Sequence, residues 1–336
     1  MTNSVTIVTT VSNYTEHRGP LSRLEMLIEH FKSLDAKVEV CCVSFGRPNI
    51  DVYLDCKVYY VPVKLKDFMY MFLDLIRLRP ISVALFQRSA FRVKEDSLVC
   101  FHLIRTMQLR AMQSRDNTFN LDYCEHLSEN FLKRSKFYNW FKLKKHILAL
   151  ESRLLRNFER KLPQLNIDTI YVISASEQYG PALCSNIIAP SNLARLPTQR
   201  KSISLVSDFL FIGHVDYEPN LESIIRLLNC LHCLKKTAHV HIIGKINRHN
   251  RALLKKFPNA IVYGYIEDPK TIARKCDLGF AYITIGTGTQ NKVFDYLRYD
   301  LPVIVSESVE DGLTSSVRKL VHKCSDLEKF IETEVK

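Results

Sequence analysis

The sequence predicts an α/β protein built from two Rossmann-like domains that face each other across a cleft. Three observations lead to this prediction. The chain has 336 residues, which is too long for one ordinary core. Its apolar runs are continuous rather than alternating, as strands buried on both faces of a parallel sheet require. Strand and helix patterns also alternate in both halves, and this order produces parallel sheets covered by helices.

In the first half, aliphatic strand patterns alternate with helix patterns. The longest expected helix carries an apolar stripe that should face the core. The stripe consists of Ile147, Leu150, Leu154, Phe158 and Leu162. The expected elements are strands 4–11, 37–45, 57–63, 97–107 and 168–174 and helices 21–34, 67–78 and 141–162.

The second half repeats this order after a linker at 186–204, which contains two prolines and shows no periodicity. The expected strands are 209–213, 240–244, 260–264, 278–283 and 302–306, and the expected helices are 220–235, one from 248, 269–275 and one from 290. We therefore divide the chain into an N-terminal domain at 1–190, a C-terminal domain at 191–325 and a last helix at 326–336. That helix is expected to pack back toward the N-terminal domain.

Composition narrows the class of protein. No apolar run reaches the ~18 residues that a membrane span needs, and the N-terminus lacks the regions of a secretory signal. The ten cysteines fall mostly in apolar segments and indicate buried thiols in a cytosolic protein. Cys230 and Cys233 resemble half a metal site, but they lie within a helix and no second pair follows, so we expect no metal. No zinc-finger or helix-turn-helix pattern accompanies the basic charge, so nucleic acid is not an expected partner.

The formal charge of +12 is concentrated in one segment. Residues 132–161 contain ten Lys or Arg and two Glu, and aromatic residues are interspersed among them. Membrane-surface segments combine cations and aromatics in this way. Lys142, Lys144, Lys145 and Trp140 are therefore candidates for contact with an anionic inner-membrane surface. The alternative is a solvated helix face whose apolar stripe packs on the first domain.

The stretch "GTGTQNKVFDYLRYDLPVIVS" at 286–306 is the main candidate for a ligand site. A loop with Gly286 and Gly288 leads into a helix start, whose free N–H groups and dipole favour an anion. Lys292 would add a movable positive charge for a diphosphate, and Asp295 lies one turn further on, where it would accept hydrogen bonds from a ribose. The alternative is a plain connection between a strand and a helix, since helix starts with glycine are common.

These segments resemble the retaining glycosyltransferases of family 4, which have the GT-B fold, and in particular the bacterial polysaccharide-assembly and lipopolysaccharide-assembly sugar transferases. "GTQNKVFDYLRYDLPVIV" is similar to the family's donor-site helix and the "GxPVV" that follows it. "FLFIGHVDYEPNLESI" resembles the start of its nucleotide domain, and "VHIIGK" and "IVYGYIEDPKTIARKCDLGFAYI" its later strands. In the first half, "GPLSR", "LDYCEHLSENF" and "ALESRLLRNFERK" resemble further family segments.

The resemblance implies transfer of a sugar from a nucleotide-sugar donor to a glycan or lipid-linked acceptor, with retention at the anomeric carbon and with no metal or cofactor. It places the acceptor side in the first domain, near Gly19 and Arg23, and the donor in the second. Catalytic candidates are Lys292, Asp295, His102 and Arg105. Donor-binding candidates are Gly286, Thr287, Gly288, Thr289, Gln290, Asn291, Lys245, Arg248, Tyr265, Ile266, His214 and Asp216.

Several alternatives stay open. His102 also fits a satisfied core histidine, and Arg105 fits a structural ion pair. Thr287 stands where the family commonly has a glutamate near the donor sugar, and it supplies no carboxylate. A degenerate transferase that binds nucleotide-sugar, or a partner transferase, without turnover is therefore the alternative to an enzyme. A sugar-nucleotide epimerase would need acid and base residues that the sequence does not identify.

Overall fold

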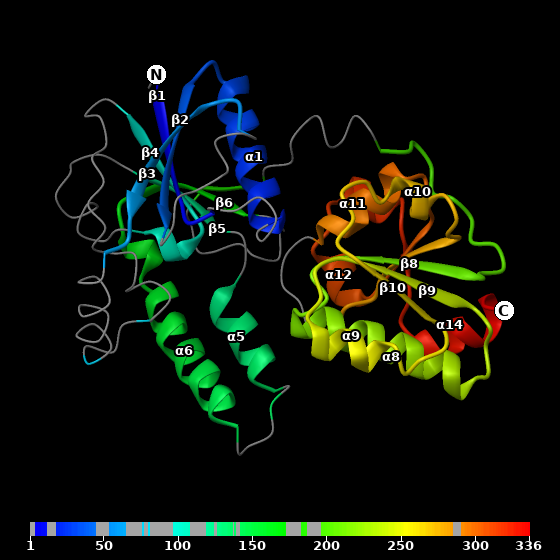
Figure 1. Cartoon of the computed structure of the whole chain (residues 1–336). Coiled ribbons are helices and arrows are strands. Elements are labelled where there is room, and N and C mark those ends of the chain that lie inside the picture. The colour runs from blue at the N-terminus through cyan, green and yellow to red at the C-terminus, as the bar shows by residue number, and fades with distance from the viewer. Residues whose placement is uncertain are drawn as a thin grey trace. The chain divides into compact units, whose positions relative to one another are not determined.

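The structure is a computed structural model of the chain, and Figure 1 shows its course. It describes residues 4–11, 18–44, 54–64, 76, 80, 97–107, 119–123, 126–136, 138, 142–172, 183–186, 196–284 and 290–336. By its contacts the chain divides into two compact units, Met1–Pro190 and Ser191–Lys336. Each unit is a parallel sheet with its own helices, so the α/β class predicted from the sequence is confirmed.

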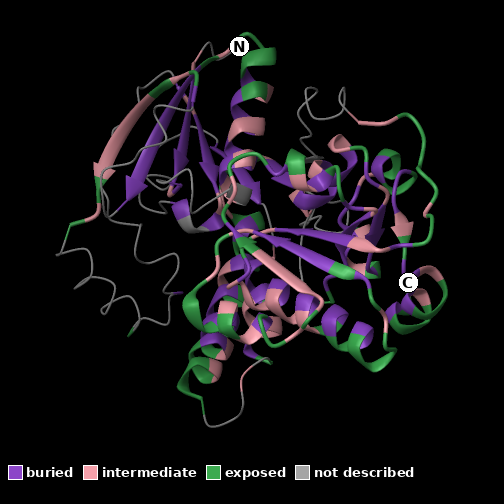
Figure 2. Cartoon of the chain, turned by 45° about the vertical axis from the view of Figure 1, so that its right-hand side comes forward, coloured by how far each residue is buried: buried purple, intermediate pink, exposed green. Residues whose placement is uncertain are grey.

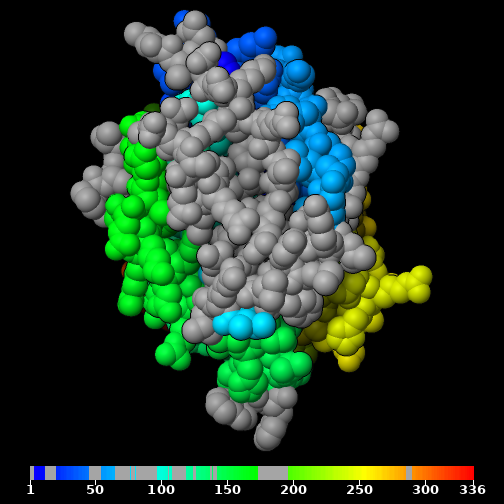
Figure 3. All heavy atoms as spheres, turned by 90° about the vertical axis from the view of Figure 1, so that its left-hand side faces the viewer, coloured from blue at the N-terminus to red at the C-terminus, as the bar shows by residue number. Residues whose placement is uncertain are grey.

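The first unit contains a parallel sheet of seven strands within its described residues, in the order β3-β2-β1-β4-β5-β6-β7. The direction in which strands are added reverses between β1 and β4, as in doubly wound folds. β3 forms one edge, and its light-blue spheres lie at the surface in Figure 3. The strands are β1 (Ser4–Thr9), β2 (Lys37–Ser44), β3 (Lys57–Pro62), β4 (Leu98–His102), β5 (Phe119–Tyr123), β6 (Ile167–Val172) and β7 (Leu183–Asn186), and the helices are α1 (Arg18–Ser33), α5 (Leu127–Ser135) and α6 (Leu143–Glu159), with 3-10 turns at Ile104–Thr106 and Leu162–Gln164.

All five strands that the sequence predicted in the first half are present, but β5 and β7 were not expected. β5 has the sequence FNLDY, and all five of its side chains are buried. The helix predicted at 67–78 lies outside the described residues, apart from Ile76. The hydrophobic pattern therefore identified the aliphatic strands and missed the strand that buries Asn120 and Asp122.

The second unit contains six parallel strands within its described residues, in the order β10-β9-β8-β11-β12-β13. The strand order reverses between β8 and β11, so the topology of the first six strands of the first unit is repeated. The strands are β8 (Asp208–Ile212), β9 (His239–Ile243), β10 (Ala260–Gly264), β11 (Leu278–Ala281), β12 (Val303–Val305) and β13 (His322–Lys323), and the helices are α8 (Glu218–Cys233), α9 (Arg248–Leu254), α10 (Lys270–Ala273), α11 (Asn291–Arg298), α12 (Glu307–Asp311), α13 (Ser315–Arg318) and α14 (Leu327–Glu334).

Helices cover both faces of the second sheet, and a separate apolar cluster fills each side. On one side, α8 directs Ile224, Leu227, Leu228 and Leu231 inward, at the spacing of one helical stripe. The other side is closed by apolar residues of α10 to α13. In Figure 2 the central strands are purple, that is buried, whereas the helices carry exposed green residues on their outer sides.

The last helix, α14, contacts α8 within the second unit. α14 begins at the cap residue Asp326, whose carboxylate accepts a hydrogen bond from the backbone N–H of Lys329 at 3.1 Å. Its apolar residues Leu327 and Ile331 are buried in the cluster beneath α8. Its buried face therefore packs within the second unit.

The buried face of α6 also differs from the predicted stripe. Leu154 is buried as expected, but Ile147 and Leu150 are 48% and 50% exposed. Glu151 and Glu159 take the inward positions instead. Glu159 accepts hydrogen bonds from the backbone N–H and the hydroxyl of Ser128 in the first turn of α5. A carboxylate at a helix N-terminus is stabilised by these donors and by the helix dipole.

The thiols of Cys41, Cys42, Cys100 and Cys276 are buried and unbridged, as predicted. Burial raises the pKa of Cys41 and of Cys42 to about 12, so both stay protonated and act as small apolar groups. Cys230 is buried, whereas Cys233 is exposed. Among the described residues, no helix has the length and apolarity needed to cross a membrane.

Candidate functional site

The carboxyl ends of β8 and β11 define the candidate site of the second unit. These strands are neighbours at the point where the strand order reverses, and ligands of doubly wound sheets bind at such points. The chain continues from β8 into α8 and, beyond Thr284, into α11. Three side chains meet here: Phe211 from β8, Asn220 from the first turn of α8 and Lys292 from the first turn of α11.

Lys292 points into the unit and not into solvent. Its Nζ donates a hydrogen bond to Oδ1 of Asn220 at 2.8 Å and lies 4.1 Å from the centroid of the Phe211 ring. Among the described residues no carboxylate forms an ion pair with it, and only 7% of Lys292 is exposed. Burial lowers the pKa of Lys292 from 10.5 to about 7. The sequence predicted a movable positive charge for a diphosphate, and in the structure the amine is held beneath the helix start by Asn220.

Tyr296 fixes the position of α11 on the sheet. Its hydroxyl accepts a hydrogen bond from the backbone N–H of Ile212 at 2.9 Å and donates one to the carbonyl of Phe280 at 3.2 Å. The ring is fully buried, and burial raises the pKa of its hydroxyl. One side chain therefore ties α11 to both β8 and β11, which orients the first turn that carries Lys292.

Two glycines end β8 and β9 with little room above them. A Cβ on Gly244 would lie 1.7 Å from the carbonyl oxygen of Gly213. This distance is too short for any side chain, so the position requires glycine. Gly213 itself has φ of +155°, and a Cβ there would lie 3.3 Å from Nδ2 of Asn220 and 3.5 Å from Nζ of Lys292. The strand ends therefore approach each other backbone to backbone beside the amine.

The loops after β8 and β9 are joined through Asp216. Its Oδ1 accepts hydrogen bonds from the backbone N–H of Asn247 at 3.0 Å and from Nδ2 of Asn250 at 2.7 Å. His214 is exposed, with Nε2 3.8 Å from the Asp216 carboxylate. Lys245 and Arg248 are also exposed in this region. The structure thus assigns Asp216 a role in joining the loops and leaves two cations at the surface near the carboxyl end of β9.

The remaining donor candidates occupy different environments. Gln290 precedes α11 and Asn291 begins it. Oδ1 of Asp295 lies 3.5 Å from Nη1 of Arg298 within the same helix, and the Asp295 side chain is partly exposed. Tyr265 is exposed, whereas Ile266 packs against the core beneath α11. Gly286, Thr287, Gly288 and Thr289 lie outside the described residues.

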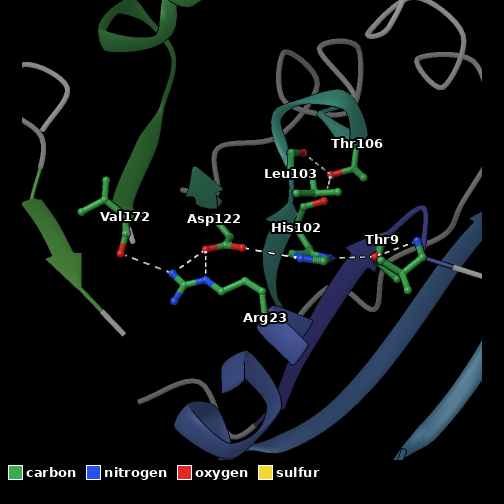
Figure 4. A network of polar contacts seen from close by, with 8 residues as sticks. Thr9, Arg23, His102, Leu103, Thr106, Asp122 and Val172 are labelled. Carbon is green, nitrogen blue, oxygen red and sulfur yellow. Dashed lines mark hydrogen bonds and ion pairs between the residues drawn. The ribbon is translucent and has the colours of Figure 1, made fainter. Parts of the chain in front are cut away.

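The first unit has a buried polar network at the carboxyl ends of β1, β4 and β5, shown in Figure 4. Arg23 donates from Nε and from its terminal nitrogen to Oδ1 of Asp122, at 2.9 and 2.7 Å. Asp122 Oδ2 lies 3.7 Å from Nε2 of His102, whose Nδ1 is 2.8 Å from the hydroxyl of Thr9. All four side chains are buried. The network pairs the buried guanidinium with a carboxylate and gives Nδ1 of the imidazole a hydrogen-bond partner, and polar groups removed from water need such partners.

This network contains two of the predicted site residues, Arg23 and His102. Arg23 was placed beside the acceptor, but α1 already begins at Arg18, so Gly19 lies in the first turn of the helix and Arg23 points inward to Asp122. His102 occupies the core position that the sequence left open as its alternative. Arg105 belongs to the 3-10 turn Ile104–Thr106, and its side chain is not among those described.

Sequence reasoning did not single out Asn220, Phe211 or Asp122. Asn220 could have been found, because it ends the "YEPN" that opens the second domain and is placed one turn into a helix. Asp122 was covered only by the resemblance of "LDYCEHLSENF" to a family segment, and its partner Arg23 is 99 positions away.

Comparison with known proteins bears on both units. Residues 207–333 match the family model described as "Glycosyl transferases group 1". The matched residues lie within the second unit. This match includes Asn220, Lys292 and Tyr296, the residues around the carboxyl ends of β8 and β11. No curated protein matched the chain.

Solved glycosyltransferase structures share the fold over almost the whole chain. HepE of Anabaena, crystallised with UDP and glucose, is 11% identical with a TM-score of 0.59, covering 98% of this chain and 89% of its own. S. aureus TarM, in complex with Fondaparinux, alpha-GlcNAc-glycerol and UDP, is 8% identical with a TM-score of 0.61, covering 97% and 91%. A glycosyltransferase from Rickettsia africae ESF-5 is 12% identical with a TM-score of 0.54, covering 97% and 85%. The chain therefore has the GT-B fold.

Proposed function

We propose that the chain is a retaining, metal-independent glycosyltransferase of family 4. It would move a sugar from a nucleotide-sugar donor to a glycan or lipid-linked acceptor in cell-surface polysaccharide synthesis, at the cytoplasmic face of the inner membrane. The observation that carries the proposal is the lysine held beneath the start of α11 inside a domain matched by a glycosyltransferase family. The UDP complexes of HepE and TarM make UDP-sugars the first donors to test.

In this mechanism the main chemical task is to stabilise the departing diphosphate. Negative charge accumulates on the phosphates as the glycosidic bond breaks, and preorganised donors stabilise it. The backbone N–H groups at the start of α11 would supply such donors, and the helix dipole would reinforce them. Lys292 would add a positive charge at the same helix end, since an anion raises the pKa of a nearby amine and thereby favours its protonated form.

Asp295 and the two exposed cations would complete the donor site. Asp295 is partly exposed one turn along α11, within reach of a ribose hydroxyl if the diphosphate rests on the helix start. Lys245 and Arg248 are exposed after β9 and would supplement the charge of Lys292. Tyr265 would contact the base after β10. The acceptor would bind in the first unit, where the buried network connects the ends of β1, β4 and β5.

A catalytically degenerate protein is the second candidate. Thr287 replaces the glutamate that the family commonly has near the donor sugar, so a carboxylate is missing from that position. Such a protein would still bind nucleotide-sugar, through the same helix start and lysine, and would serve as a partner of an active transferase.

Thermal unfolding with a panel of nucleotide-sugars tests the binding step. A donor that binds only the folded chain raises the melting temperature by mass action. We expect one of the UDP-, GDP-, dTDP- or CMP-sugars to raise it in a concentration-dependent way, and failure of all four classes would contradict the proposal.

Transfer to a lipid-linked acceptor separates the two candidates. Product formed in the presence of a chelator, with the anomeric configuration of the donor retained by NMR, supports a retaining and metal-independent enzyme. Donor binding without hydrolysis or transfer supports the degenerate protein.

A further inference from the structure

Helix α6 exposes an apolar stripe that the first unit leaves uncovered. Leu143, Ile147 and Leu150 are 73%, 48% and 50% exposed. They are spaced by four and three positions, so they lie on one side of the helix. The opposite side is buried through Leu148 and Leu155, and Leu154, one turn beyond Leu150 on the same side as the stripe, is buried as well. Exposed large apolar side chains that gather in one place mark an interaction surface.

Positive charge surrounds this stripe. Lys142, Lys144, Arg153 and Arg156 are exposed along the same helix. Lys144 and Lys142 also lie over the ring of Tyr138, with Nζ 4.6 and 6.0 Å from its centroid. The Tyr138 ring and two of the cations of this segment are therefore adjacent in the structure.

The two acidic residues of α6 are removed from this surface. Glu151 is 4% exposed and Glu159 is 1% exposed, and Glu159 is used at the start of α5. Between Leu143 and Glu159 the exposed side thus combines cations with leucine and isoleucine and carries no carboxylate. We call this surface, formed by Lys142, Leu143, Lys144, Ile147, Leu150 and Arg153, the basic apolar face.

We propose that the basic apolar face is a docking surface for an anionic lipid bilayer, with α6 lying parallel to the membrane plane. Amphipathic helices bind in this way when apolar side chains enter the acyl boundary and cations contact lipid phosphates. The biological role of this binding rests on the proposed function, because a lipid-linked acceptor is located at a membrane surface. The binding itself requires no nucleotide.

Charge complementarity favours a bilayer over other occupants. A second copy of the chain would bring the same cations opposite each other, which opposes association. Nucleic acid would use the cations, but leucine and isoleucine offer it neither stacking nor hydrogen bonds. An anionic bilayer uses both components of the face, since it supplies phosphates and an apolar interior within a few ångströms of each other.

Flotation of the full chain with vesicles tests the proposal. The probes are vesicles of phosphatidylcholine alone and vesicles with about a third of anionic phosphatidylglycerol, at low and at high salt. We expect the chain to float with the anionic vesicles at low salt, and the fraction that floats with neutral vesicles to be at least about tenfold smaller. Flotation with the anionic vesicles should decrease as the salt concentration rises.

Matched variants distinguish binding through the basic apolar face from non-specific adsorption to vesicles. Leu143→Ser, Ile147→Ser and Leu150→Ser together should lower flotation at least about tenfold. The control replaces three exposed leucines elsewhere, Leu34→Ser, Leu205→Ser and Leu234→Ser, and should float like the wild type. For charge, Lys142→Gln, Lys144→Gln and Arg153→Gln should lose anionic binding, whereas Lys255→Gln, Lys256→Gln and Lys319→Gln should not.

Each contrary result has a defined meaning. No flotation, or equal flotation of the Leu143, Ile147 and Leu150 variant and its control, would overturn the proposal. Concentration-dependent dimerisation abolished by the same variant would replace the bilayer by a second copy, and oligonucleotide binding without flotation would replace it by nucleic acid. Donor-dependent thermal shifts measured on the same proteins keep the two proposals apart: flotation with no donor binding overturns the proposed function and not the docking surface.

Discussion

Asn220 and Lys292 are 72 positions apart in the chain and meet in one hydrogen bond of 2.8 Å, which joins the first turn of α8 to the first turn of α11. The acceptor is a neutral amide, and among the described residues no carboxylate pairs with the amine. The lysine is therefore positioned without its charge being neutralised. That combination suits a site that must receive an anion, because a resident carboxylate would compete with it.

Replacing Lys292 should change the pH dependence of stability. Burial lowers its pKa from 10.5 to about 7, so between these values the unfolded chain holds a proton that the folded chain has released. The free energy of unfolding gains a contribution from this group that rises with pH, by up to about 1.4 kcal/mol per unit. Lys292→Met removes that contribution.

The measurement is urea unfolding of both proteins across this pH range. The free energy of unfolding of Lys292→Met minus that of the wild type should be largest at pH 7 and below. This difference should shrink as the pH rises toward 10.5. An exposed control, Lys319→Met, should show no such trend. A difference that stays constant with pH would mean that Lys292 keeps its ordinary pKa.

Lys292→Ala should weaken the donor site. The loss of one charged contact to a diphosphate corresponds to about 1.5–3 kcal/mol, which is a tenfold or greater loss in turnover or affinity. Calorimetric titration with UDP and a turnover assay provide the measurement. Lys319→Ala, an exposed lysine of the same unit, is the control. Unchanged affinity together with normal turnover in the Lys292 variant would remove this residue from the site.

Breaking the Arg23–Asp122 pair should destabilise the first unit strongly. Both side chains are buried, and Asp122→Asn would leave the guanidinium without its counter-charge, at a cost of about 3–5 kcal/mol. The double variant Arg23→Met with Asp122→Leu should recover much of this loss, since it removes both charges. Urea unfolding checks both, and a Lys32→Ala variant, which breaks the exposed pair with Asp55, should change stability by less than about 1 kcal/mol.

Glu159→Ala should weaken the start of α5. The carboxylate accepts from the backbone N–H and hydroxyl of Ser128, and loss of a helix cap costs about 0.5–2 kcal/mol. Glu129→Ala is the matched control, because that carboxylate is exposed and its Oε2 lies 3.9 Å from Nζ of Lys133, which is a weak ion pair. Equal effects of the two substitutions would show that the cap adds nothing.

Much of the fold could be predicted from the sequence, most closely in the second unit. The runs FLFI, VHII and LGFA are buried in the middle of the sheet and contain almost only apolar residues, so each is recognisable without its neighbours. β5 is different, because Asn120 and Asp122 are buried only by virtue of Tyr171 and Arg23. Partners 51 and 99 positions away leave no local pattern.

The same limit applies to the sites. The stretch around Lys292 was identified from the helix start that follows a glycine loop, but its inward direction depends on Phe211 and Asn220, which belong to other elements. In α6 the apolar spacing placed Ile147 and Leu150 inside, whereas the structure buries Glu151 and Glu159 and uses Glu159 to cap a neighbouring helix. Periodicity describes one helix at a time, and these orientations are decided between helices.

The contact between Gly244 and the carbonyl of Gly213 also has a consequence for protein engineering. With 1.7 Å between that oxygen and any Cβ at position 244, a randomised library at this position should return glycine alone, whatever activity is selected. Directed evolution of donor preference therefore has to hold that turn constant and draw its diversity from exposed neighbours such as Lys245 and Arg248.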